Sequence, residues 1–222
     1  MKKNAALVDP RRRLLLASGL IACGGFFPLR RAFAASAATD TTQGHDHQAH
    51  EHEHHVPPGI KRSEADYKIP AVTLVRQDGT TVSFPQVLDD GRPVILDFIY
   101  TACTAICPIL SQVFFEVQQK LGGERNKVNM VSISIDPEFD TPARLTEYAK
   151  KFRAAAQWQY YTGTVAASVA VQKAFNAYRG DKMNHSPVTF LRAAPGKPWV
   201  RLDGLASPDL VIKEYRSLVK GA

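Results

Sequence analysis

Residues 94–120 read VILDFIYTACTAICPILSQVFFEVQQK, and this stretch determines the fold of the chain. Its first seven residues are nearly all apolar, with β-branched and aromatic side chains, which is typical of a strand buried on both faces of a sheet. The residues after Pro108 instead place apolar side chains at helical spacing, at Leu110, Val113, Phe114 and Val117. Pro108 suits the first turn of such a helix, where an N–H donor is not needed. We therefore expect Cys103 and Cys107 where a buried strand gives way to a helix.

The positive charge of the chain is concentrated at its N-terminus. The formal net charge is +7, but residues 1–34 hold seven of the 28 basic side chains and one of the 21 acidic ones. The remainder is therefore almost neutral. A phosphate-binding surface needs clustered basic residues, so we expect no nucleic-acid partner.

Residues 1–34 have the features of an export signal: a basic start, an apolar stretch at 14–29 and the small-residue sequence AFA at 32–34. Three arginines at 11–13 followed by leucines resemble a twin-arginine signal, so we expect export and cleavage after Ala34. In a second interpretation LIAC resembles a lipobox, and a lipidated Cys23 would tether the protein to a membrane. A third is an uncleaved anchor, although a spanning helix needs roughly 20 residues. All three place the folded part outside the cytoplasm, in a bacterial periplasm.

Residues 35–66 are predicted to be a disordered linker, because this polar segment lacks apolar periodicity. Residues 45–55 contain six of the seven histidines, interleaved with carboxylates. Such a tract suits Cu(II), Ni(II) or Zn(II) with exchangeable ligands. The alternative is a solvated linker that binds metal only adventitiously.

Residues 67–222 are predicted to form one α/β domain. It opens with a β-hairpin, residues 71–75 and 81–84 joined across Asp78-Gly79. Further strands are expected at 128–135, 158–161, 188–192 and 199–202, and further helices at 141–152, 165–178 and 208–219. Thr141 should cap the first of these helices, with Pro142 at its first position. This alternation favours a mainly parallel sheet and resembles a thioredoxin-like domain.

Cys103 and Cys107 are spaced so that their sulfurs can form a disulfide or converge on one ion. Cys107 lies nearer the helix N-terminus, which favours the thiolate, so we expect it to gain more acidity than Cys103. A thiolate is both the nucleophile of disulfide exchange and a metal ligand. An inert structural disulfide is a weaker interpretation, because closing so short a loop removes little entropy from the unfolded chain.

Two thiolates are too few to hold a metal ion, which directs attention to His185. It is the only histidine in residues 67–222 and lies just before the predicted strand 188–192. In a thioredoxin-like sheet, the loop ahead of that strand faces the cysteine turn. Met183 is a conceivable additional thioether ligand, and Asp136 could act behind the ligands or simply end its strand.

Three motifs in order resemble the SCO/SenC family: CTAICP at 103–108, SISIDPEFDTP at 132–142 and HS at 185–186. Members are membrane-associated, thioredoxin-like copper chaperones for assembly of cytochrome c oxidase. The resemblance implies that Cys103, Cys107 and His185 bind copper, as Cu(I) or Cu(II), in accord with the softness of these ligands. It also implies delivery of copper to the dinuclear site of oxidase subunit II, or reduction of the cysteines of that site.

Two other functions fit the same residues. In one, Cys103 and Cys107 are the redox pair of a thiol–disulfide oxidoreductase and copper is incidental, although the usual redox spacing is CxxC. In the other, the two cysteines and His185 form an open zinc site. The chain is therefore primarily a metal carrier by this interpretation, with thiol–disulfide reductase activity as the enzymatic alternative. Since metal binding needs reduced sulfurs, we expect an exported thioredoxin-like reductase as a partner.

Overall fold

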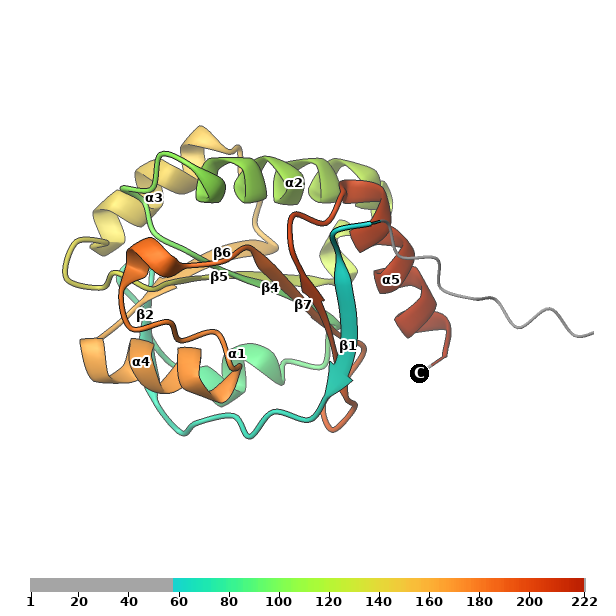
Figure 1. The fold of residues 1–222 in the computed structure, drawn as a ribbon, viewed down its shortest axis with the longest axis horizontal. Helices are drawn as coiled ribbons and strands as arrows, with labels where there is room; N and C mark the ends of the chain where they lie inside the picture. The colour runs from blue at the N-terminus through green and yellow to red at the C-terminus, as the bar shows by residue number, and fades with distance from the viewer. Residues whose placement is uncertain (1–57, 222) are drawn as a thin grey trace, which may run out of the picture. The chain divides into compact units, whose positions relative to one another are not determined.

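The computed structural model describes residues 58–221, which form a mixed α/β domain. Figure 1 shows one twisted sheet with helices on both faces. The elements in chain order are β1 (Lys61–Ala65), β2 (Thr73–Arg76), β3 (Thr81–Ser83), α1 (Phe84–Leu88), β4 (Val94–Ile99), α2 (Ile106–Leu121), the 3₁₀ helix η1 (Gly122–Lys127), β5 (Asn129–Ser134), α3 (Pro142–Lys151), β6 (Trp158–Thr162), α4 (Val165–Ala174), the 3₁₀ helix η2 (Lys182–Asn184), β7 (Val188–Arg192), β8 (Trp199–Asp203) and α5 (Pro208–Lys220).

The eight strands form a single sheet in the order β1-β8-β7-β4-β5-β6-β2-β3. Strand β4 lies inside it, parallel to β5 and antiparallel to β7. Only β4–β5 and β5–β6 are parallel pairs, so the expectation of a mainly parallel sheet is wrong. A parallel pair needs a crossover helix, and α2 and α3 supply the two crossovers, whereas the hairpins β2–β3 and β7–β8 pair antiparallel.

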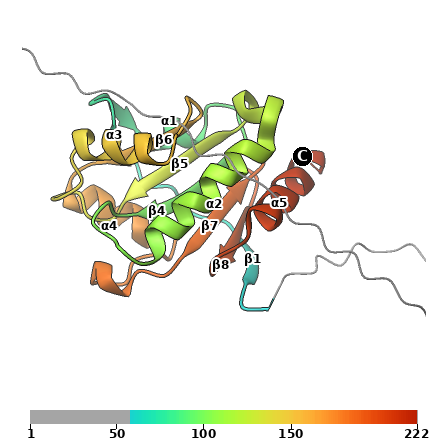
Figure 2. The same cartoon turned by 90° about the horizontal axis from the view of Figure 1, so that it is seen from above.

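The core consists of two apolar clusters, one on each face of the sheet. On one face α2, α3 and α5 pack through buried side chains that include Phe114, Leu145 and Val211. On the other, α1 and α4 contribute Phe84 and Val171. Figure 2 shows α2 and α5 side by side over the first face. Because every residue of β4 is buried, the end of this strand projects its loop from a rigid base.

Several local predictions are confirmed. Thr141 accepts a hydrogen bond from the backbone N–H of Arg144 at 3.3 Å, and Pro142 is the first residue of α3. The hairpin turns at Gly79, whose φ of +86° suits glycine. The short helix α1, in contrast, was not predicted.

The ordered domain begins before the predicted boundary at residue 67. Strand β1 pairs antiparallel with β8, with Lys61 opposite Asp203. Arg62 also donates a 2.9 Å hydrogen bond to Glu214 of α5. Backbone hydrogen bonds rather than apolar burial hold this edge strand in place. Its side chains are mostly polar, so the sequence shows no alternating apolar pattern there.

The predicted export signal, Cys23 and the tract at 45–55 lie outside the described residues. Within residues 58–221 no helix is long and apolar enough to cross a membrane.

Candidate metal centre

The two cysteines lie in the turn between β4 and α2, as predicted. Cys103 belongs to the loop, and its backbone N–H donates to the Tyr100 carbonyl at 3.2 Å. Cys107 is the second residue of α2, and its N–H donates to the Cys103 sulfur at 3.4 Å. Both thiols are free, with Cys103 8% exposed and Cys107 fully buried. The turn therefore brings two reduced sulfurs together, with Cys103 the nearer to solvent.

The acidities of the two thiols are the reverse of the prediction. Burial opposes ionisation of Cys103, but hydrogen bonds from the N–H groups of Cys107 and Ala105 outweigh it and lower the pKa of this thiol. Burial raises the pKa of Cys107 well above its ordinary value. Nearness in sequence to the helix N-terminus was misleading, because the N–H groups there point at the Cys103 sulfur.

His185 follows η2, directly ahead of β7, as the sequence suggested. Its Nε2 lies 3.0 Å from the carbonyl oxygen of Phe98 on β4, so the ring reaches the strand that leads to the cysteines. Burial lowers the pKa of the imidazole, which favours the neutral form that binds metals. The ring borders a cavity of about 170 Å³, also lined by Asp136 and Arg179.

The structure does not gather the three predicted ligands around one point. Among residues 58–221, no three histidine, cysteine, aspartate or glutamate side chains are arranged to hold a metal ion. Cys103 and Cys107 are adjacent, whereas the His185 nitrogen is engaged with the Phe98 carbonyl. The donor types nevertheless fit copper, since two soft sulfurs and a neutral imidazole belong to neighbouring loops. His185 has to leave Phe98 to join them.

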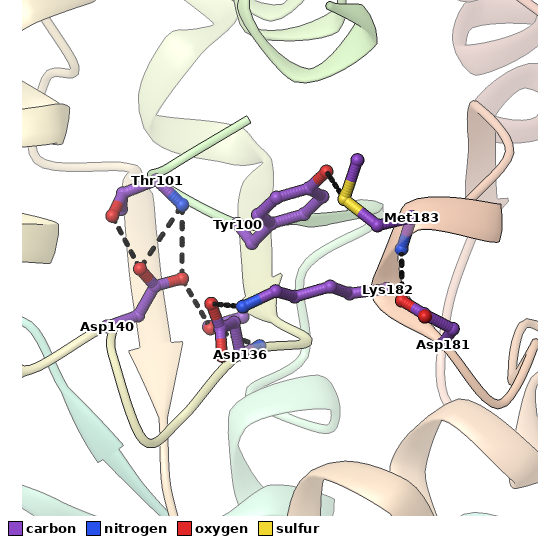
Figure 3. A network of polar contacts seen from close by, with 8 residues as sticks. Tyr100, Thr101, Asp136, Asp140, Asp181, Lys182 and Met183 are labelled. Atoms are coloured by element: carbon purple, nitrogen blue, oxygen red, sulfur yellow. Dashed lines mark hydrogen bonds and ion pairs between the residues drawn. The ribbon is translucent and has the colours of Figure 1, made fainter. Parts of the chain in front are cut away.

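Figure 3 shows contacts that hold η2 against the cysteine turn. Lys182 Nζ lies 2.5 Å from Asp136 Oδ2, and the Tyr100 hydroxyl donates to the Met183 sulfur at 3.7 Å. Asp181 accepts the backbone N–H of Met183 at 2.8 Å. We call these five residues the clasp. Asp136 thus does more than end its strand, because its carboxylate anchors the segment that carries His185.

Asp140 joins the cysteine turn to the loop between β5 and α3, a role that the sequence did not reveal. Its buried carboxylate accepts the Thr101 hydroxyl at 2.5 Å, the Thr101 backbone N–H at 3.1 Å and the Ser134 hydroxyl at 2.6 Å. Burial raises its pKa despite these donors. The DPEFDTP sequence at 136–142 was the available signal, but no role was predicted for Asp140.

We expect Asp140→Ala to lower the free energy of unfolding by about 3 kcal/mol, because one buried donor and two partly buried donors would lose their acceptor. Urea unfolding followed by circular dichroism measures this effect. Glu138→Ala is the matched control, since Glu138 is exposed in the same loop. Equal stabilities of the two variants would contradict this role for Asp140.

Asp97 is a second buried carboxylate, and the sequence predicted no role for it. It lies on β4 between Ser132 of β5 and Thr189 of β7, and it is fully buried. Neither of its oxygens has a well-formed hydrogen bond to any residue in 58–221. Burial raises its pKa to about 7, and the nearby Ser132 hydroxyl opposes this shift. The apolar residues around Asp97 predicted a buried strand. The unfavourable free energy of burying a carboxylate within that strand was not considered.

Comparisons with known proteins identify the family of this chain. A family model described as SCO1/SenC matches residues 61–220. The SCO1 protein homolog of Bacillus subtilis is 33% identical over 99 residues, covering 44% of this chain and 50% of the relative. Protein SenC of Rhodobacter capsulatus is 32% identical over 127 residues, covering 54% and 56%. The matches thus span about half the length of these curated relatives.

Two solved structures are similar over most of their own length. BsSco, a member of the Sco family of cytochrome c oxidase assembly proteins in which a disulfide switch was identified, is 28% identical, with a TM-score of 0.60 and coverage of 70% of this chain and 95% of that one. Bradyrhizobium japonicum ScoI with copper bound is 26% identical, with a TM-score of 0.56 and coverage of 66% and 96%. The predicted thioredoxin-like α/β fold is confirmed. The chain belongs to the SCO1/SenC family.

Proposed function

We propose that this protein is an extracytoplasmic copper carrier for cytochrome c oxidase assembly. The observation that carries the proposal is the pair of free thiols next to the N-terminus of α2. Backbone N–H groups favour the ionised form of one of them, Cys103, despite its burial. Thiolates are the ligands that select Cu(I). The copper-bound ScoI relative supports copper as the cargo.

In this proposal each ligand has a distinct task. Cys103 is the sulfur nearer to solvent and the more acidic, so it makes the first contact with incoming copper. Cys107 is held beneath it and gives up its proton when it binds, because a coordinated thiol is deprotonated. His185 exchanges the Phe98 carbonyl for the metal and closes the site around Cu(II).

The client is the dinuclear copper site of oxidase subunit II, which the family's role in oxidase assembly supports. An exported thioredoxin-like reductase keeps Cys103 and Cys107 reduced, since a disulfide offers no thiolates. Cells that lack the protein should lose oxidase activity when copper is scarce. Wild-type protein should restore that activity and Cys103→Ser should not; rescue by the serine variant would exclude the carrier role.

Metal analysis of the full chain purified from its native compartment tests the identity of the cargo. We expect copper whose content falls by one ion per chain in the double variant Cys103→Ser, Cys107→Ser. Because the double variant keeps the histidine tract at 45–55, any copper that remains in it reports copper held outside the cysteines. Zinc in place of copper at the cysteines would overturn the proposal in favour of an open zinc site.

One observation favours thiol–disulfide exchange as a second function. The opposite pKa shifts of Cys103 and Cys107 match an attacking thiolate backed by a buried resolving thiol. In that case His185→Ala should leave disulfide exchange unchanged, because the imidazole contacts Phe98 rather than either sulfur.

A further inference from the structure

Tyr100 contacts residues from two distant parts of the chain. Its hydroxyl donates to the Met183 sulfur at 3.7 Å. Its carbonyl accepts the Cys103 backbone N–H at 3.2 Å, and burial and, after it, the neighbouring Cys103 thiol raise the pKa of its hydroxyl. Tyr100 is therefore a common neighbour of Met183 and Cys103, although 80 positions separate those two residues in the sequence.

Met183 is the solvent-facing member of this group. Its side chain is 73% exposed, whereas Tyr100 and Cys103 are nearly buried. An exposed methionine normally samples many rotamers at a surface, but here the start of its short helix is fixed. The clasp holds Lys182 on Asp136, and Asp181 caps the backbone of Met183. Figure 3 shows the Met183 sulfur at the tip of η2, directed at the Tyr100 hydroxyl.

The softness of the donor atoms decides which oxidation state of copper a site with Met183 or with His185 suits. Thioethers and thiolates select Cu(I), while nitrogen and oxygen donors suit Cu(II). His185 lies two positions beyond Met183, and its ring is already engaged by Phe98. The same short segment thus offers an exposed thioether that contacts the Tyr100 hydroxyl and an imidazole that has to break its contact with Phe98 first.

We propose that Met183 is the third ligand of the Cu(I) form, completing a three-sulfur site with Cys103 and Cys107, and that His185 serves the Cu(II) form. This inference rests on the proposed function, because it assumes that the two cysteines hold copper. The copper–ligand bonds form as the S–H bonds of the two thiols break, and no oxidation state changes. The Tyr100 hydroxyl releases the Met183 sulfur, and the thiol protons pass to solvent.

Selenium X-ray absorption of the full chain tests the proposal directly. The three methionines are replaced by selenomethionine and the protein is loaded with one equivalent of Cu(I). We expect a copper neighbour in the selenium spectrum, and we expect Met183→Leu to remove it, since Met130 is fully buried on β5. A selenium spectrum without a copper neighbour would overturn the assignment.

Affinity measurements provide the second readout. Competition with bicinchoninate for Cu(I) should show about a tenfold or greater loss for Met183→Leu, comparable with losses seen when groups around a metal are removed. Its affinity for Cu(II) should be unchanged. His185→Ala is the matched control from the same segment and should show the opposite pattern, losing Cu(II) more than Cu(I).

Cu(I) binding by the double cysteine variant and by Met183→Leu distinguishes failure of the carrier proposal from failure of the Met183 assignment. If wild type and the double cysteine variant bind Cu(I) equally weakly, the copper carrier proposal itself is wrong. If wild type binds Cu(I) through its cysteines and Met183→Leu binds it equally well, only the Met183 assignment is wrong. Leucine has a similar volume at this exposed position, and circular dichroism verifies that the variant is folded.

Discussion

Replacing Cys103 or Cys107 with serine is expected to lower copper affinity at least about a hundredfold, more than the loss of a group that only supports a ligand. A serine hydroxyl stays protonated at neutral pH and is a hard donor, so it does not replace a thiolate for Cu(I). His185→Ala should cause a large loss of Cu(II) affinity. Equilibrium dialysis against a calibrated chelator measures both effects.

Thr104→Ala is the matched control, because Thr104 is an exposed residue of the same turn. It should bind copper as wild type does. Serine at the fully buried position of Cys107 also perturbs packing, so unfolding of each variant is measured alongside. Unchanged copper affinity in either serine variant would exclude the dithiol site. Unchanged Cu(II) affinity in His185→Ala would instead favour the oxidoreductase interpretation.

Asp97 is expected to make the protein less stable as the pH rises from about 4 to about 7. Its pKa is about 7 in the folded protein and ordinarily 3.8, so between these values only the unfolded chain loses the proton. Stability therefore falls through this window by up to about 4 kcal/mol, and below pH 3.8 this group has no effect. Above pH 7 its contribution is constant.

Asp97→Asn isolates the effect of this one carboxyl group. Cys107, Tyr148 and Tyr160 interact electrostatically with Asp97, but burial raises the pKa of each, so they stay neutral in this window. We expect the difference in unfolding free energy between variant and wild type to grow in the variant's favour from pH 4 to pH 7. Asp209→Asn, at an 83% exposed carboxylate, should show no such trend. Parallel urea-unfolding curves for Asp97→Asn and wild type across pH would contradict the raised pKa.

The sequence predicted the parts of this fold that depend on local patterns. The apolar run before the cysteines is the buried strand β4, and the helical spacing after Pro108 is the buried face of α2. The Thr141 cap was predicted because its side chain acts on neighbouring backbone, and the Asp78-Gly79 turn was predicted because glycine adopts a positive φ. These features need no knowledge of the rest of the chain.

Features that depend on distant partners were missed. Strand β1 forms because it pairs with β8, and its polar side chains do not predict a strand. The order of the thiol pKa values depends on which sulfur the N–H groups of α2 reach, and this direction is set by the path of the loop. The positions of His185 and Met183 likewise depend on Phe98 and Tyr100, which precede them by more than 80 positions.

Copper X-ray absorption of the copper-loaded full chain tests the central claim most directly, because it counts the sulfur atoms bound to the metal. We predict at least two sulfur ligands in wild type and their loss in the double variant Cys103→Ser, Cys107→Ser. A spectrum with only nitrogen and oxygen neighbours in wild type, unchanged by the double variant, would contradict a copper site at the start of α2.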